Sequence, residues 1–230
     1  AGAELADEDG QLDSVGDFFG SGSPQTLNFS LDREATAVFL EGRFPLLSGL
    51  TGQLGLRHDR VDEGDSSDSE TTPHLGLVWA LPDNATTLKA NYNEGFKPPS
   101  FFALGFPLGG NPALDPERSR NVDLTVSRRI DAAGSALQLS VFKTHYEDLV
   151  DFDSDTFTNI NRGTIVIQGI EPELDLRINR HWHVQANASL LDIDERDGLQ
   201  PLRNRPERTA AANLSHDFEG GHTAFIGLSY

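Results

Sequence analysis

The sequence predicts an all-β fold, an antiparallel transmembrane β-barrel with short periplasmic turns and long extracellular loops. Apolar and polar residues alternate along about ten segments, the pattern of strands with one apolar and one polar face. The connections between these segments alternate between short and long, as at the two ends of an outer-membrane barrel. No run of about eighteen apolar residues occurs, which excludes a membrane-spanning helix but not membrane-spanning strands.

The predicted strands follow one another at regular spacing, and each has an apolar face. In chain order they are 34–44, 50–60, 73–81, 87–96, 121–130, 135–146, 163–178, 182–192, 208–217 and 222–230. Their apolar faces contain, strand by strand, Val38 and Leu40, Leu54 and Leu56, Leu75 and Leu77, Leu88 and Ala90, Val122 and Leu124, Leu137 and Leu139, Ile170 and Leu174, Val184 and Ala186, Ala210 and Ala212, and Ile226 and Leu228. Most of these segments are close to the roughly 9–11 residues with which a tilted strand crosses a bilayer.

The polar faces indicate which side of the sheet meets lipid. In segment 163–178, Glu171, Glu173, Asp175 and Arg177 follow one another on a single face. Burying such a row in a dry core would cost several kcal/mol for each uncompensated ion. We therefore expect the apolar face to meet lipid and the charged face to line a wet lumen.

The connections sort by length along the chain. The short ones are 45–49, 82–86, 130–134, 179–181 and 218–221, and the long ones are 61–72, 97–119, 147–162 and 193–206. Aromatic residues at or beside the short connections are Phe44, Trp79, Trp182 and Phe218. An aromatic girdle at the periplasmic interface would occupy these positions, although aromatics also favour strands in general.

Composition excludes several classes of function. With 36 acidic and 18 basic residues the net charge is −18, which argues against nucleic acid and suits divalent ions or cationic ligands. The chain has no cysteine, so it has neither a thiol nucleophile nor a zinc–thiolate site. The pair His181 and His183 has no third ligand nearby, and the acidic run 62–70 lacks the spacing of a calcium loop. We expect no catalytic residues, no metal site and no cofactor.

Four segments resemble the β-barrel domain of TonB-dependent outer-membrane receptors. They are residues 93–102 (NEGFKPPSFF), residues 110–119 (GNPALDPERS), residues 145–174 (containing YEDLV, NINRG and IQGIEPEL) and residues 205–212 (RPERTAAA). The resemblance implies a partial barrel over residues 34–230, about ten strands of the roughly twenty-two in the family, without the plug domain. Residues 1–33 are interpreted as an acidic extracellular loop or the end of a preceding strand.

The resemblance also implies a function. The receptor would sit in the outer membrane of a Gram-negative bacterium, in contact with its lipid, and take up a scarce small ligand such as a ferric siderophore or cobalamin. Energy would come from the TonB complex through the plug domain, so the barrel would not be an enzyme. Two alternatives stay open at this point: a passive porin-like channel, and a soluble β-rich binding or adhesion protein.

The candidate ligand-binding residues come from one strand and the loop that follows it. They are Lys89, Asn91, Asn93, Phe101, Phe102 and Phe106. The first three project to the lumen in a row, and the phenylalanines are large apolar groups without an evident core. Exposed aromatics beside convergent polar groups are a common recognition surface. The alternative is that the phenylalanines pack against neighbouring loops.

Overall fold

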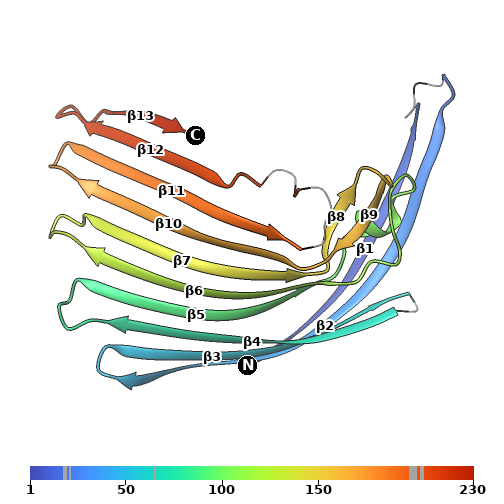
Figure 1. The fold of residues 1–230 in the computed structure, drawn as a ribbon, viewed down its shortest axis with the longest axis horizontal. Coiled ribbons are helices and arrows are strands. Elements are labelled where there is room, and N and C mark those ends of the chain that lie inside the picture. The colour runs from blue at the N-terminus through green and yellow to red at the C-terminus, as the bar shows by residue number, and fades with distance from the viewer. Residues whose placement is uncertain (18–19, 21, 65, 197–200, 203–204) are drawn as a thin grey trace.

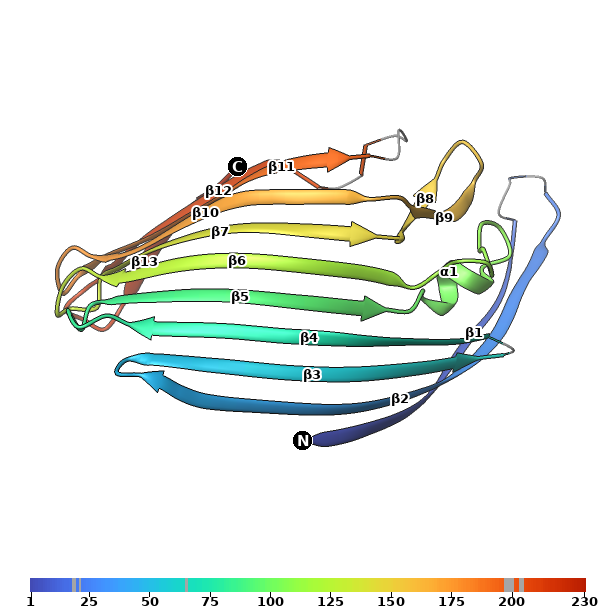
Figure 2. The same ribbon diagram turned by 60° about the horizontal axis from the view of Figure 1, so that its bottom comes forward.

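The alternating segments form one curved antiparallel sheet of eleven strands, which the computed structural model describes for residues 1–17, 20, 22–64, 66–196, 201–202 and 205–230 (Figure 1). The strands of this sheet are β1 (Gly2–Gly16), β2 (Gln25–Leu47), β3 (Leu50–Glu63), β4 (Ser66–Ala80), β5 (Thr86–Lys97), β6 (Glu117–Arg129), β7 (Ala136–Glu147), β10 (Ile165–Arg177), β11 (Trp182–Glu195), β12 (Arg208–Asp217) and β13 (Thr223–Ser229). They lie side by side in chain order, with β7 next to β10. β1 and β13 are the edges of an open trough (Figure 2).

The remaining elements lie in two of the loops. α1 (Phe101–Gly105) lies between β5 and β6. β8 (Leu149–Asp153) and β9 (Thr158–Arg162) pair as a separate hairpin between β7 and β10. Figure 2 shows both at the end of the sheet opposite the short turns. Among the described residues, no helix combines the length and the apolar character needed to cross a bilayer.

Each of the ten predicted strands overlaps an observed strand, so the all-β prediction is confirmed. The predicted long loop at 61–72 is wrong, because β3 continues to Glu63 and β4 begins at Ser66. Arg60 and Asp62 form an ion pair at 2.9 Å in this extension. Residues 62–72 are almost all polar, so apolar alternation is absent and the sequence resembles a loop.

Residues 1–33 contain the strand β1 and the start of β2, where a loop or the end of a preceding strand was expected. β1 pairs with β2 along its whole length, from Gly2 opposite Phe39 to Gly16 opposite Gln25. The predicted loop at 193–206 begins later than expected, since β11 runs to Glu195, and part of it lies outside the described residues.

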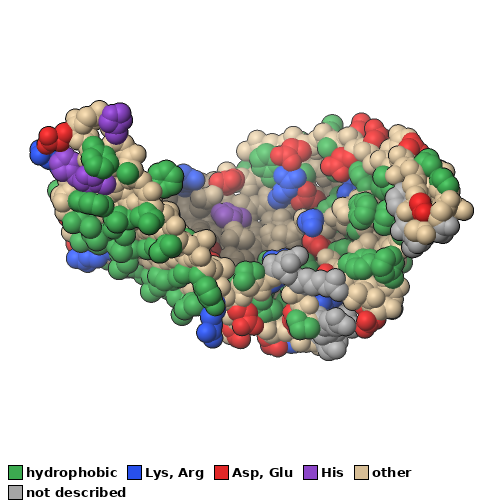
Figure 3. All heavy atoms as spheres, turned by 90° about the horizontal axis from the view of Figure 1, so that it is seen from above, with side chains coloured by type: hydrophobic (Ala, Val, Ile, Leu, Met, Phe, Trp, Pro, Cys, Tyr) green, Lys and Arg blue, Asp and Glu red, His purple; other side chains and the backbone are tan. Residues whose placement is uncertain are grey.

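The outer face of the sheet is an apolar surface. Adjacent strands place leucines opposite each other, as in the pairs Leu40–Leu56 and Leu54–Leu75. These side chains do not pack into a core, since Leu40 is 65% exposed and Leu75 is 44% exposed. Figure 3 shows apolar side chains over the outside of the trough and charged side chains around and within its hollow. A contiguous apolar face of this extent is stable against lipid rather than water.

The short turns are held by local hydrogen bonds. Asp83 accepts from the backbone N–H groups of Ala85 (3.0 Å) and Thr86 (2.9 Å) and from the Thr86 hydroxyl (2.7 Å). These bonds, the hydroxyl first, hold the pKa of Asp83 at about 2, below its usual range. Asn179 caps the turn before β11 in the same way, accepting from the N–H groups of His181 and Trp182.

Candidate functional site

The loop after β5 folds into a small packed unit at the extracellular end of the sheet. Pro98 and Pro99 have no N–H to donate, so the strand ladder stops there. Ser100 then caps α1, its hydroxyl accepting from the N–H of Ala103 at 3.1 Å. Leu104 of α1 packs with Ala103 and Leu114 in a buried cluster that Leu31 and Val150 complete. The loop is therefore anchored by apolar contacts to both β2 and the β8–β9 hairpin.

Arg33 on β2 ties this loop to the sheet. Its guanidinium donates to the carbonyl of Pro99 at 2.6 Å and to the carboxylate of Glu63 at 3.0 Å. It lies 3.6 Å from the carboxylate of Glu8 and 4.6 Å from the ring centre of Phe101. Because the Arg33 side chain is only 6% exposed, these partners compensate a charge removed from water.

Asparagine side chains bind the loop to the β8–β9 hairpin. Asn161 donates to the carbonyls of Asp115 (2.9 Å) and Asp148 (2.7 Å), and its side-chain oxygen accepts from the N–H of Asp115 (2.8 Å). Asn159 donates to the carbonyl of Gly109 at 2.8 Å, and Asn111 donates to the carbonyl of Asn159 at 2.9 Å. The segments GNPALDP and NINR therefore contact each other, and their asparagines act in loop architecture. Sequence reasoning missed these pairs, for which the only signal was asparagine in both segments.

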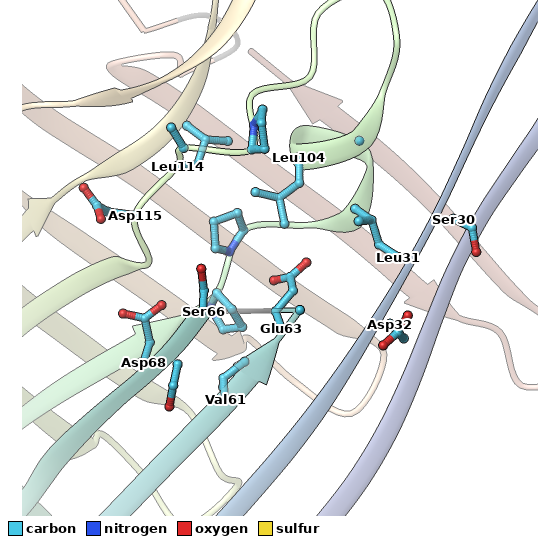
Figure 4. Close-up of a pocket in the computed structure, with 17 residues that line it drawn as sticks. Ser30, Leu31, Asp32, Val61, Glu63, Ser66, Asp68, Leu104, Leu114 and Asp115 are labelled. Atoms are coloured by element: carbon cyan, nitrogen blue, oxygen red, sulfur yellow. The ribbon is translucent and has the colours of Figure 1, made fainter.

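A pocket of about 780 Å³ lies beneath α1, between the loop and the extracellular ends of β2, β3 and β4 (Figure 4). Its apolar lining includes Leu31, Val61, Pro98, Leu104 and Leu114, and its acidic lining includes Glu63, Asp68 and Asp115. One carboxylate oxygen of Glu63 is buried and has no hydrogen-bond partner among the described residues. The volume is in the range of small-molecule sites.

Lys89, Asn91 and Asn93 lie in the predicted row on β5, on the polar face of the sheet. Asn91 donates to the carboxylate of Asp123 on β6 at 2.8 Å. Asn93 pairs in register with Asn121, whose side chain also donates to Asp123 at 3.2 Å. The row on β5 thus continues into a polar network on β6. The alternation of side chains along β6 places Asn121 and Asp123 on the same face of the sheet, and this alternation was the sequence signal for the network.

The three phenylalanines take different positions. The Phe101 ring lies against Gly10 of β1, where an added Cβ would come within 2.4 Å of it. Phe102 and Phe106 stack with ring centres 4.4 Å apart, and Phe102 is 56% exposed. Phe101 packs the α1 loop against β1 and β2, whereas Phe102 of the stacked pair is exposed. None of the six candidate residues is among those that line the pocket beneath α1.

Comparison with known proteins agrees with this architecture. The family model described as TonB dependent receptor-like, beta-barrel matches residues 2–230. The vitamin B12 transporter BtuB of Photobacterium profundum is 35% identical over 195 residues, covering 80% of this chain and 30% of the relative. BtuB of Vibrio vulnificus is 27% identical over 134 residues, covering 54% of this chain and 21% of the relative. The chain thus spans less than a third of the length of these curated relatives.

A solved structure has the same fold. The ferripyoverdine receptor of the outer membrane of Pseudomonas aeruginosa, bound to ferripyoverdine, superposes with a TM-score of 0.68. It is 20% identical, and the match covers 90% of this chain and 29% of that one. The chain therefore belongs to the TonB-dependent receptor-like β-barrel family and is part of the barrel wall in the outer membrane of a Gram-negative bacterium.

Proposed function

We propose that this chain is part of an outer-membrane receptor that takes up a small ligand at the expense of energy delivered by the TonB complex. The observation that carries the proposal is the contrast between the two faces of the sheet. The outer face is apolar, whereas the inner face carries a polar network, and packed loops cover a pocket at its extracellular end. A wall of this kind can select a ligand and shield it from lipid.

The proposed ligand class follows from the relatives. Two are vitamin B12 transporters, and a structural neighbour is a receptor bound to ferripyoverdine. We infer that this receptor takes a scarce metal-containing chelate, of the cobalamin or ferric-siderophore kind. The barrel wall would act by binding and positioning, so no catalytic group is assigned to it and it is not proposed as an enzyme. The plug domain of the family would carry the contact with TonB.

The test is uptake by cells that produce the full-length receptor. Radiolabelled cobalamin and a panel of iron(III) siderophores are offered with and without an uncoupler that collapses the proton-motive force. We expect at least one ligand to accumulate, and accumulation to stop on uncoupling. Accumulation that persists on uncoupling would instead identify a passive channel, and recovery of the protein outside the membrane fraction would identify a soluble binding protein.

For the ligand contacts we propose Lys89, Asn91 and Asn93 on the wall, with the stacked pair Phe102 and Phe106 above them. Replacing both phenylalanines by Ser should weaken ligand binding by roughly tenfold or more, the scale of an exposed aromatic anchor. The matched control is Phe101→Ser, which removes the ring that packs on Gly10 and should perturb the loop itself. Binding is measured on intact cells, with surface exposure of the receptor checked by antibody. Unchanged affinity in the double variant would remove this pair from the site.

A further inference from the structure

The pocket beneath α1 combines an apolar floor with an acidic rim. Leu31, Val61 and Leu104 line it from three elements that are far apart in the sequence, and Figure 4 shows them around one hollow. Asp68 and Asp115 also line it. The Asp68 carboxylate interacts electrostatically with Arg118, and neither carboxylate accepts a hydrogen bond or lies within 4 Å of a cation among the residues that the structure describes. Lys, Arg and His are absent from the described lining. The lining therefore carries acidic side chains and no basic ones beside apolar surface.

The cations around this pocket are already engaged by carboxylates. Arg33 is held by Glu63 at 3.0 Å and is almost fully buried. The ammonium of Lys97 lies 2.9 Å from Glu117. The guanidinium of Arg118, at the start of β6, lies 2.6 Å from the carboxylate of Glu70. An anionic ligand would have to break one of these pairs, and it would also meet the repulsion of the carboxylates in the lining.

We propose that this pocket receives an organic cation, or the cationic part of a ligand, whose apolar body rests on the leucines and whose charge faces Asp68 and Asp115. The inference rests on the proposed uptake function and narrows its ligand class. It disfavours chelates with a net negative charge, such as tris-catecholate iron(III) complexes. Partial enclosure by protein focuses the field of the carboxylates, so the charge complementarity also attracts cations to the mouth.

A pair of dyes tests the charge preference directly. A cationic rhodamine and the anionic fluorescein share a tricyclic xanthene core, and each is titrated into the full-length receptor in non-ionic detergent while fluorescence anisotropy is recorded. We expect the rhodamine to bind at least about tenfold more tightly, with an affinity that falls as salt is added. The double variant Asp68→Asn and Asp115→Asn should lose about three- to tenfold in rhodamine affinity, since two facing charges disappear.

The matched control is the double variant Asp9→Asn and Asp155→Asn, which changes the net charge equally at exposed positions outside the pocket. Its rhodamine affinity should equal that of the unaltered receptor. Tighter or equal binding of fluorescein, unchanged rhodamine affinity in the Asp68 and Asp115 variant, or binding of neither dye would each overturn the inference. The uncoupler experiment decides the uptake function independently, because dye binding in detergent requires no energy source.

Discussion

The two ends of the sheet differ in how far apart in the sequence the residues lie whose hydrogen bonds hold the connections between strands. At the end with the short turns, the bonds that close each turn come from neighbours in the sequence, as when Asn179 accepts from His181 and Trp182, two and three residues away. Bonds such as that from Arg129 to the carbonyl of Asn84 only join one turn to the next. At the end with the loops, the partners are distant. Asn161 and Asp115 are 46 residues apart, and Arg33 and Pro99 are 66 apart.

This difference separates turns that fold by themselves from loops that fold only together. A local side-chain bond can form as soon as its turn forms. The extracellular unit instead requires β2, the α1 loop and the β8–β9 hairpin to be in place before its asparagines and Arg33 find their partners. A surface built in this way has one arrangement, which is what a selective binding site requires.

The largest expected effect is a difference in cysteine labelling between the two ends of the sheet, which tests which end faces the outside of the cell. The chain contains no cysteine, so single cysteines at Ser66, Asp155 and Asn84 can serve as reporters. All three positions are exposed. A membrane-impermeant maleimide applied to intact cells should label the first two and leave Asn84 unlabelled, because Asn84 lies in a short turn. Equal labelling of the three positions would refute the assigned orientation.

The next effect probes the ties between the loops. Asn161→Ala removes three hydrogen bonds to two loop segments and should lower the free energy of unfolding by about 2 kcal/mol. Limited proteolysis should then cut between β5 and β6 while the sheet stays intact. Asn179→Ala is the control, since its bonds lie within one turn. If both variants resist protease equally, the loops do not depend on each other.

The smallest expected effect is a difference in stability loss between two Gly→Ala variants, at glycines that both have positive φ. Gly49 has φ 75°, and an added Cβ would lie 2.4 Å from the carbonyl oxygen of Ala80, whereas Gly64 has φ 55° and open space around it. Gly64→Ala should cost about 1 kcal/mol for the left-handed backbone alone, and Gly49→Ala should cost about 1–2 kcal/mol more because the turn must shift. Thermal unfolding in detergent measures both. A smaller loss for Gly49→Ala would contradict this ranking.

The sequence predicted several residues of the candidate site, but it did not predict which of them contact each other. The parity of β5 placed Lys89, Asn91 and Asn93 on the polar face, because side chains alternate strictly along a strand. The same reasoning could not separate Phe101, which packs on Gly10, from Phe102, which is displayed. That distinction depends on β1, a strand in which the acidic stretch from Asp7 to Asp9 has no apolar alternation.

By itself, the sequence determined the ten strands predicted over residues 34–230, the face of the sheet on which their residues lie, the short turns and the family. These features follow from period-two alternation and from turn chemistry, which involve only residues close along the chain. Only the tertiary structure decided that residues 61–72 continue two strands, that Arg33 meets Glu63 and Pro99, and that a pocket forms beneath α1. Those features depend on which strands are neighbours and in what register they pair. The sequence of one polar segment does not indicate which distant segment it will contact.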